Sequence, residues 1–144
     1  TDLGFADPRA HPPKAHPLPY GNWLRTPCAG RTLLAGDAGG FVEPLFGEGI
    51  FYALATGHHA GAAAADAIPQ GRDPGPAYQA RLERTILPEL RGADRYRWGL
   101  FKAQRLLGAV GLKHFAKPGS TKPAEMVHGM RSWNWMRRKD WEIF

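Results

Sequence analysis

The sequence predicts a mixed α/β fold, which is α+β within these 144 residues taken alone, and three observations support it. An apolar run over residues 31–35 has the length and flanking residues of a short buried strand. An Ala-rich run over residues 48–68 is stopped by a Pro and a Gly, which predicts one long helix. After these breakers, apolar residues recur at steps of three and four, as on further helices. We therefore divide the chain into a mixed segment, residues 1–72, and a helical segment, residues 73–144.

The composition is that of an ordinary globular domain, since 43% of the residues are hydrophobic and the length allows one core. Cys28 is the only cysteine, which excludes an internal disulfide. It has no partner at metal-ligand spacing, so the sequence favours a reducing compartment and predicts no metal site. No run of about eighteen apolar residues is present, as a membrane-spanning helix would require. We expect a cytoplasmic protein.

The charge is unevenly distributed along the chain. Residues 1–72 carry five Lys or Arg against six Asp or Glu, whereas residues 73–144 carry fourteen against seven. A basic segment indicates an acidic partner, such as a dinucleotide phosphate, a diphosphate-bearing substrate or anionic lipid. The basic residues show no pattern of a nucleic-acid-binding module, so we expect no nucleic-acid partner.

The first thirty residues are rich in proline and lack periodicity, which disfavours helices. One short edge strand around Ala15–Tyr20 is the only regular element expected there. The buried strand at residues 31–35 follows, and a loop, Gly36–Gly47, leads into the helix at residues 48–68. Small residues on that helix predict close packing against its neighbours; they are Ala53, Gly57, Gly61 and Ala64.

The loop and the helix start have the features of a ligand site. Asp37 lies just after a strand end, among glycines and alanines, and offers two acceptor oxygens to the hydroxyl groups of a ligand. Residues 44–50 open the helix, so its free amides and the positive end of its dipole point at whatever lies in front. This arrangement suits an electron-rich ring or an anion.

Further features have structural interpretations. His58 and His59 point about 100° apart on a helix, so we expect one to face solvent and the other to be packed, without a shared metal. Pro88 interrupts the periodic series that contains Leu82, Ile86 and Leu90, and it is expected to kink or divide that helix. The Trp- and Arg-rich tail, residues 126–144, is interpreted as a docked helix or as an amphipathic surface that meets membrane lipid.

Residues 34–54 resemble the second flavin-contacting motif of the geranylgeranyl reductases, a branch of the FAD enzymes that include the aromatic hydroxylases. Residues 44–53 follow the pattern Pro-Leu-x-Gly-Glu-Gly-Ile-Tyr-Tyr-Ala of that branch, except that Phe51 stands at the first Tyr. Residues 16–20 and 86–91 are also similar to the branch. The resemblance covers residues ~14 to ~92.

The resemblance implies a function and a set of contacts. Asp37 would bind the ribityl or diphosphate-linking part of FAD, and the amides of residues 47–50 would face the isoalloxazine, stabilising the charge of its reduced form. NAD(P)H or another reductant would supply electrons, and the substrate would be an isoprenoid lipid or a prenylated small molecule whose carbon–carbon double bonds are reduced. No catalytic residue is assigned. The implied cofactor-binding residues are Gly36, Asp37, Pro44, Gly47, Glu48, Gly49 and Ile50.

The family's Gly-x-Gly-x-x-Gly turn, which follows its first strand, does not occur in these residues. The resemblance therefore implies the carboxyl-terminal part of a longer flavoenzyme, in which residues 1–72 complete a Rossmann-like FAD-binding domain. Two alternatives stay open: an FAD-dependent monooxygenase of the same class, and a non-catalytic basic helical module that binds lipid or nucleic acid. Peripheral contact with a membrane is compatible with each of them.

Overall fold

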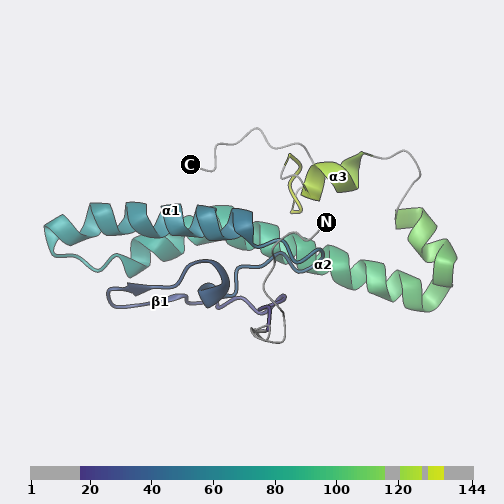
Figure 1. The fold of residues 1–144 in the computed structure, drawn as a ribbon, viewed down its shortest axis with the longest axis horizontal. Coiled ribbons are helices and arrows are strands. Elements are labelled where there is room, and N and C mark those ends of the chain that lie inside the picture. The colour runs from purple at the N-terminus through teal and green to yellow at the C-terminus, as the bar shows by residue number, and fades with distance from the viewer. Residues whose placement is uncertain (1–16, 116–120, 128–129, 135–144) are drawn as a thin grey trace, which may run out of the picture.

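The computed structural model describes residues 17–115, 121–127 and 130–134. Two long helices form its framework: α1 (Ile50–Ala67) and α2 (Gly75–Phe115) are joined by a short 3-10 turn, η2 (Ile68–Gln70), and lie side by side (Figure 1). A second 3-10 turn, η1 (Gly36–Gly39), precedes α1, and a short helix, α3 (Lys122–Val127), follows α2. The predicted helix at residues 48–68 is confirmed as α1.

The sheet consists of two short antiparallel strands, β1 (Cys28–Ala29) and β2 (Thr32–Leu33). The chain reverses between them at Gly30, whose φ of 53° suits a residue without a side chain. The strand expected at residues 31–35 is therefore shorter than predicted and pairs with the segment just before it. It is also less buried than predicted, since Thr32 is exposed and Leu33 half-buried. The fold is mixed but dominated by helix, and the described residues form no parallel sheet.

The edge strand expected around Ala15–Tyr20 is reduced to one contact in the part that the structure describes. Tyr20 forms an isolated parallel bridge with Val42, while residues 17–19 have no regular structure and residue 15 lies outside the described range. Pro17 and Pro19 lack the N–H groups that a longer ladder would need.

The core lies between α1 and α2 and is closed by the loop before α1. Residues of both sequence segments contribute to it, so the two halves of the chain share one core. On α1 the buried positions include Ala55, Thr56 and Ala63. The cluster comprises Phe41, Tyr52, Ala55, Ala63, Tyr78, Leu82, Ile86, Leu87 and Leu90.

The prediction that the small residues of α1 make close helix contacts is wrong for its two glycines. Gly57 and Gly61 are exposed, and a Cβ atom at either position would meet nothing within 4 Å. Ala53 does make a close contact, but with the loop residue Gly36. The large side chains of α2 determine which face of α1 is buried. The positions of the small residues on α1 do not predict that face.

Pro88 was expected to kink or divide this helix; α2 continues through it, so the helix is not divided there. Leu82, Ile86 and Leu90 are fully buried on both sides of the proline, and this shared packing stabilises the helix across it. The non-helical backbone lies instead at Gly108, with φ 58° and ψ −139°. That conformation is open to glycine and strained for other residues.

The chain returns to α2 after α3, as the docking interpretation predicted for the tail. Ser132 Oγ donates a 2.5 Å hydrogen bond to Glu89 Oε1, and the Trp133 amide donates one of 2.8 Å to Glu89 Oε2. The Trp133 ring is buried against Tyr96 and Phe46. This part of the tail is docked, but residues 130–134 are not helical. Residues 135–144 lie outside the described ranges.

Candidate functional site

The turn that contains Gly36 and Asp37, called the Gly-Asp turn below, is hydrogen-bonded directly to helix α1. The Gly36 amide donates a 2.9 Å hydrogen bond to Thr56 Oγ1, whose hydroxyl donates to the Tyr52 carbonyl at 2.6 Å. Gly36 has a φ of 53°, and a Cβ at this position would lie 3.0 Å from the Cβ of Ala53. A residue larger than glycine would therefore be strained and would push the turn away from the helix. Thr56 is a site-positioning residue that the sequence did not reveal, because a buried Thr inside an Ala-rich helix carries no distinctive signal.

Asp37 lies at the start of α1, beside Gly49. Its side chain is exposed, and its Oδ1 atom is 3.4 Å from the position that a Cβ on Gly49 would occupy. Residues twelve positions apart are thus brought together by the folding of the intervening loop. The carboxylate of Asp37 and the main chain at Gly49 form one edge of a candidate site.

The loop between them is held by Glu43, which sequence reasoning missed. Its buried carboxylate accepts hydrogen bonds from the amides of Leu45 at 2.7 Å and Phe46 at 2.5 Å. Burial raises the pKa of Glu43, while these two hydrogen bonds act in the opposite direction. The main chain closes the loop, because the Glu43 amide donates to the Glu48 carbonyl at 2.7 Å and the Gly47 amide donates to the Glu43 carbonyl at 3.0 Å. The sequence offered one signal for this role: an acidic residue that lies two positions before a loop amide in need of an acceptor.

Glu48 caps the helix that follows it. Its Oε1 atom accepts a 2.8 Å hydrogen bond from the Phe51 amide in the first turn of α1. The negative charge at this position also complements the helix dipole. The side chain of Glu48 therefore has a structural role, and its contribution to a cofactor site would come through the loop that it stabilises.

One amide in the same turn is open to a ligand, that of the exposed residue Ile50, whereas Tyr52 is buried. Within the part of the chain that the structure describes, the amides of Ile50 and Tyr52 have no hydrogen-bond acceptor. The side chains beside them are apolar and exposed: Ile50 is 78% and Leu54 65% accessible to solvent. The start of α1 thus presents a free donor at Ile50 next to an apolar surface and the Asp37 carboxylate.

Pro44 and Gly47 support this site from behind. Pro44 is fully buried and lies next to Gly21, so it offers no surface to a ligand. Gly47 has a φ of 76°, and a Cβ there would lie 3.1 Å from the ring of Tyr20. The Tyr20 hydroxyl donates a 2.6 Å hydrogen bond to the Leu45 carbonyl. The structure therefore separates the predicted residues into Asp37, Gly49 and Ile50 at the surface, and Gly36, Pro44, Gly47 and Glu48 in the frame that holds them.

The two histidines are placed as predicted, one exposed and one packed. His58 faces solvent, whereas His59 is buried and its Nε2 atom lies 3.0 Å from Thr85 Oγ1. Burial lowers the pKa of His59, and the nearby charges of His58, Arg81 and Arg84 lower it further.

The surroundings of Cys28 indicate a structural role for its side chain. Its Sγ atom is 3.6 Å from the Gly75 carbonyl oxygen, and burial followed by the charge of Asp73 raises its pKa. A thiol of raised pKa is a weak nucleophile at neutral pH.

Within the described ranges, no group of three or more His, Cys, Asp or Glu side chains could hold a metal ion. In the same part of the chain, no helix has both the length and the apolar character needed to cross a bilayer. Comparison with protein-family models, with curated proteins and with solved structures gave no match.

Proposed function

We propose that this chain contributes one side of an FAD site in an oxidoreductase that reduces the carbon–carbon double bonds of an isoprenoid chain. The resemblance of residues 34–54 to the geranylgeranyl reductase motif supplies the reaction and the substrate class. One structural observation carries the cofactor assignment: the Asp37 carboxylate lies next to Gly49 at the start of α1, where the amide of the exposed residue Ile50 is without an acceptor among the described residues.

The donor and acceptor groups of this edge fit the two kinds of polar group that a flavin presents. Asp37 can accept hydrogen bonds from ribityl hydroxyls, and the Ile50 amide can donate to a carbonyl oxygen of the pyrimidine edge. The bound flavin would supply hydride transfer to the alkene. The protein's part is to hold the ring, and the positive end of α1 favours the negative charge of its reduced form.

The apolar surface beside this edge is suited to a flat ring or an isoprenoid chain. Ile50 and Leu54 are one turn apart on α1, and both are largely exposed. Gly57 and Gly61 lie farther along the same helix, and a Cβ atom at either position would meet nothing within 4 Å. In this proposal the Gly-x-Gly-x-x-Gly turn that binds the other part of FAD comes from outside these 144 residues, and NAD(P)H or another reductant supplies electrons.

Amide chemical shifts of the isotopically labelled chain, titrated with FAD, test the site directly. We expect weak binding, with the largest shift changes at Gly36, Asp37, Gly49 and Ile50. An adenosine diphosphate titration serves as the control, because it lacks the isoalloxazine group and should leave unchanged the amides of Gly49 and Ile50, which face that ring in this proposal. Equal changes with both ligands, or changes confined to another surface, would remove the flavin assignment.

A further inference from the structure

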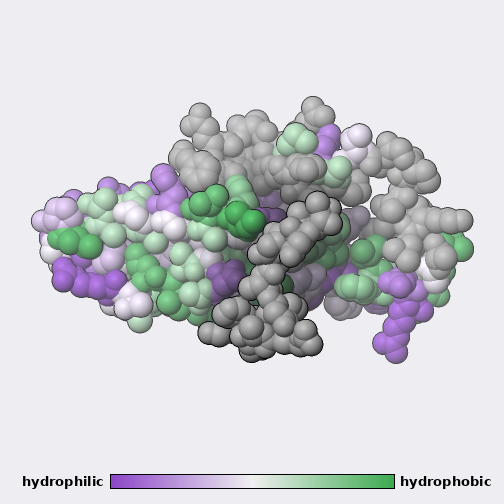
Figure 2. All heavy atoms as spheres, in the orientation of Figure 1, coloured by the Kyte–Doolittle hydropathy of each residue, from purple (hydrophilic) through white to green (hydrophobic). Residues whose placement is uncertain are grey.

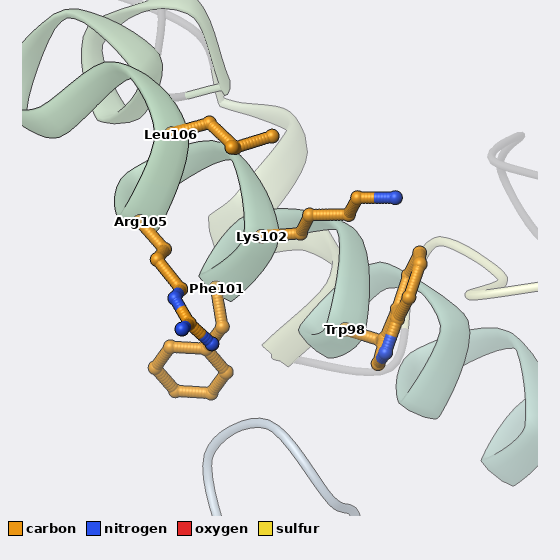
Figure 3. Close-up of a pocket in the computed structure, with 5 residues that line it drawn as sticks. All are labelled: Trp98, Phe101, Lys102, Arg105 and Leu106. Atoms are coloured by element: carbon orange, nitrogen blue, oxygen red, sulfur yellow. The ribbon is translucent and has the colours of Figure 1, made fainter.

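The outer face of α2 carries a stripe of aromatic, aliphatic and basic side chains that the flavin proposal does not use. Its members follow the spacing i, i+3, i+4, i+7 and i+8, which places them on one face of a helix. They line an open hollow of about 550 Å³ (Figure 3). We call this set the α2 stripe: Trp98, Phe101, Lys102, Arg105 and Leu106.

The apolar members of the α2 stripe are exposed to solvent. Trp98 is 65% and Leu106 70% accessible, and Phe101 is similarly exposed. Leu107 and Val110, farther along α2, are exposed as well. Figure 2 shows hydrophobic and strongly hydrophilic side chains next to each other at this end of the molecule. Exposed apolar side chains thus continue along α2 beyond the five members of the stripe.

The charges of this region have one sign. The sequence contains no Asp or Glu between Asp94 and Glu125, but seven Lys or Arg. Lys102 and Arg105 form no ion pair with a described residue; the Lys102 ammonium lies 4.7 Å from the centre of the Trp98 ring. Two cations without a carboxylate partner among the described residues therefore lie beside exposed aromatic and aliphatic groups.

We propose that the α2 stripe binds the surface of an anionic lipid bilayer. Tryptophan and phenylalanine are suited to the boundary between headgroups and acyl chains, and Lys and Arg reach from apolar surface to anionic headgroups. The stripe shares no residue with the Gly-Asp site, so this proposal stands or falls separately from the flavin assignment.

Charge and shape favour a bilayer over other acidic partners. Exposed Leu106, Leu107 and Val110 offer nothing to a nucleic acid, whose affinity depends on phosphate contacts and base stacking. An acidic protein surface would match the cations but would offer no apolar environment to Trp98 and Phe101 beside them. The boundary between headgroups and acyl chains can take up the apolar and the charged members of the α2 stripe together, because they lie on one face of the helix.

Sedimentation of the 144-residue chain with vesicles tests the proposal. We compare phosphatidylcholine vesicles with vesicles that also contain phosphatidylglycerol, at low and high salt. Binding should be stronger to the anionic vesicles and should weaken as salt rises. Each cation near an anionic surface contributes about fivefold, so Lys102→Gln combined with Arg105→Gln should weaken binding roughly twenty- to thirtyfold.

Two further variants separate the α2 stripe from the overall charge. Arg31→Gln combined with Arg72→Gln removes the same charge at exposed positions elsewhere, and it should leave binding within about threefold of the wild type. Trp98→Ser should weaken binding while leaving its salt dependence unchanged, because it removes an apolar contact. Circular dichroism verifies that each variant is folded.

Three results would overturn the proposal. The first is equal loss of binding in the two double variants, and the second is equal binding of the folded wild type to neutral and anionic vesicles, or to neither. The third is displacement of the vesicles by a single-stranded oligonucleotide that binds more tightly, which would favour a nucleic-acid partner.

Discussion

Gly92 lies where the main chain of the returning tail packs closely against α2, and replacing it with alanine tests that docking. A Cβ at Gly92 would lie 2.7 Å from the Trp133 carbonyl carbon and 2.7 Å from the Asn134 amide nitrogen. These are main-chain atoms, which cannot turn aside as the end of a flexible side chain can. The substitution must therefore displace the tail or distort α2.

The expected magnitude follows from two opposing effects. Replacing Gly with Ala inside an exposed helix stabilises it by about 0.5–1 kcal/mol. Overpacking a close contact costs about 1–3 kcal/mol, so Gly92→Ala should lower the free energy of unfolding by about 1–2 kcal/mol. Gly99 lies on the same helix, and a Cβ there would meet nothing within 4 Å. Gly99→Ala should therefore raise the free energy of unfolding by about 0.5–1 kcal/mol.

Urea unfolding followed by far-ultraviolet circular dichroism and by tryptophan fluorescence measures both variants. The same substitution at two positions of one helix should give changes of opposite sign. The fluorescence of Gly92→Ala should also shift toward that of exposed tryptophan, because Trp133 loses its packing. If Gly92→Ala is stabilised as much as Gly99→Ala, the tail does not dock on α2 as described.

Three further predictions concern the flavin site, a buried histidine and a buried carboxylate. In a protein that also supplies the dinucleotide-binding turn, Asp37→Ala should lower FAD affinity tenfold or more, because a hydrogen bond to a charged group contributes about 1.5–3 kcal/mol. The effect of Asp37→Asn on FAD affinity should be milder. Bound-flavin absorbance after desalting measures both variants, and unchanged flavin occupancy in both would contradict the assignment. Burial lowers the pKa of His59 below 6.5, so as the pH falls the histidine is protonated in the unfolded chain before it is protonated in the folded protein. The free energy of unfolding therefore keeps its full value above pH 6.5 and decreases as the pH falls below it. His59→Gln should flatten the fall in unfolding free energy below that pH. His58→Gln removes only a nearby charge and leaves the burial of His59 in place, so it should flatten the fall less; equal slopes would refute the reasoning. Glu89→Gln keeps the shape but not the charge that accepts the Ser132 and Trp133 hydrogen bonds, and should cost about 1–2 kcal/mol in urea unfolding; a change within error would show that the charge is unimportant.

The local features of this chain could be predicted from the sequence because they depend on neighbouring residues. The Ala-rich run predicted α1 to within two residues at its start and one at its end. The adjacent histidines had to point in different directions on a helix, and His58 and His59 do so. The glycines at positions 36 and 47 marked a loop, and both have the positive φ that glycine allows.

Sequence reasoning named residues of the candidate site but not their arrangement in space. Sequence reasoning grouped Asp37, Pro44 and Gly49 by their proximity in the motif, but the structure buries Pro44 and brings Asp37 to Gly49 at the surface. The supports of this arrangement, Glu43 and Thr56, went unnoticed. Their roles depend on which amide each one meets after folding, and residue type alone does not specify that.

The sequence by itself determined the helices, the loop between residues 36 and 47 and the excess of positive charge in the second half, because periodicity, glycine content and composition are properties of the chain. Only the tertiary structure decided the strand pairing, the buried face of α1, the course of α2 through Pro88 and the position of Trp133 against α2. These depend on contacts between residues far apart in the chain, such as Glu89 with Ser132. Packing across such distances outweighs the local preference of a proline, so α2 continues through Pro88, whereas its backbone leaves the helical conformation at Gly108.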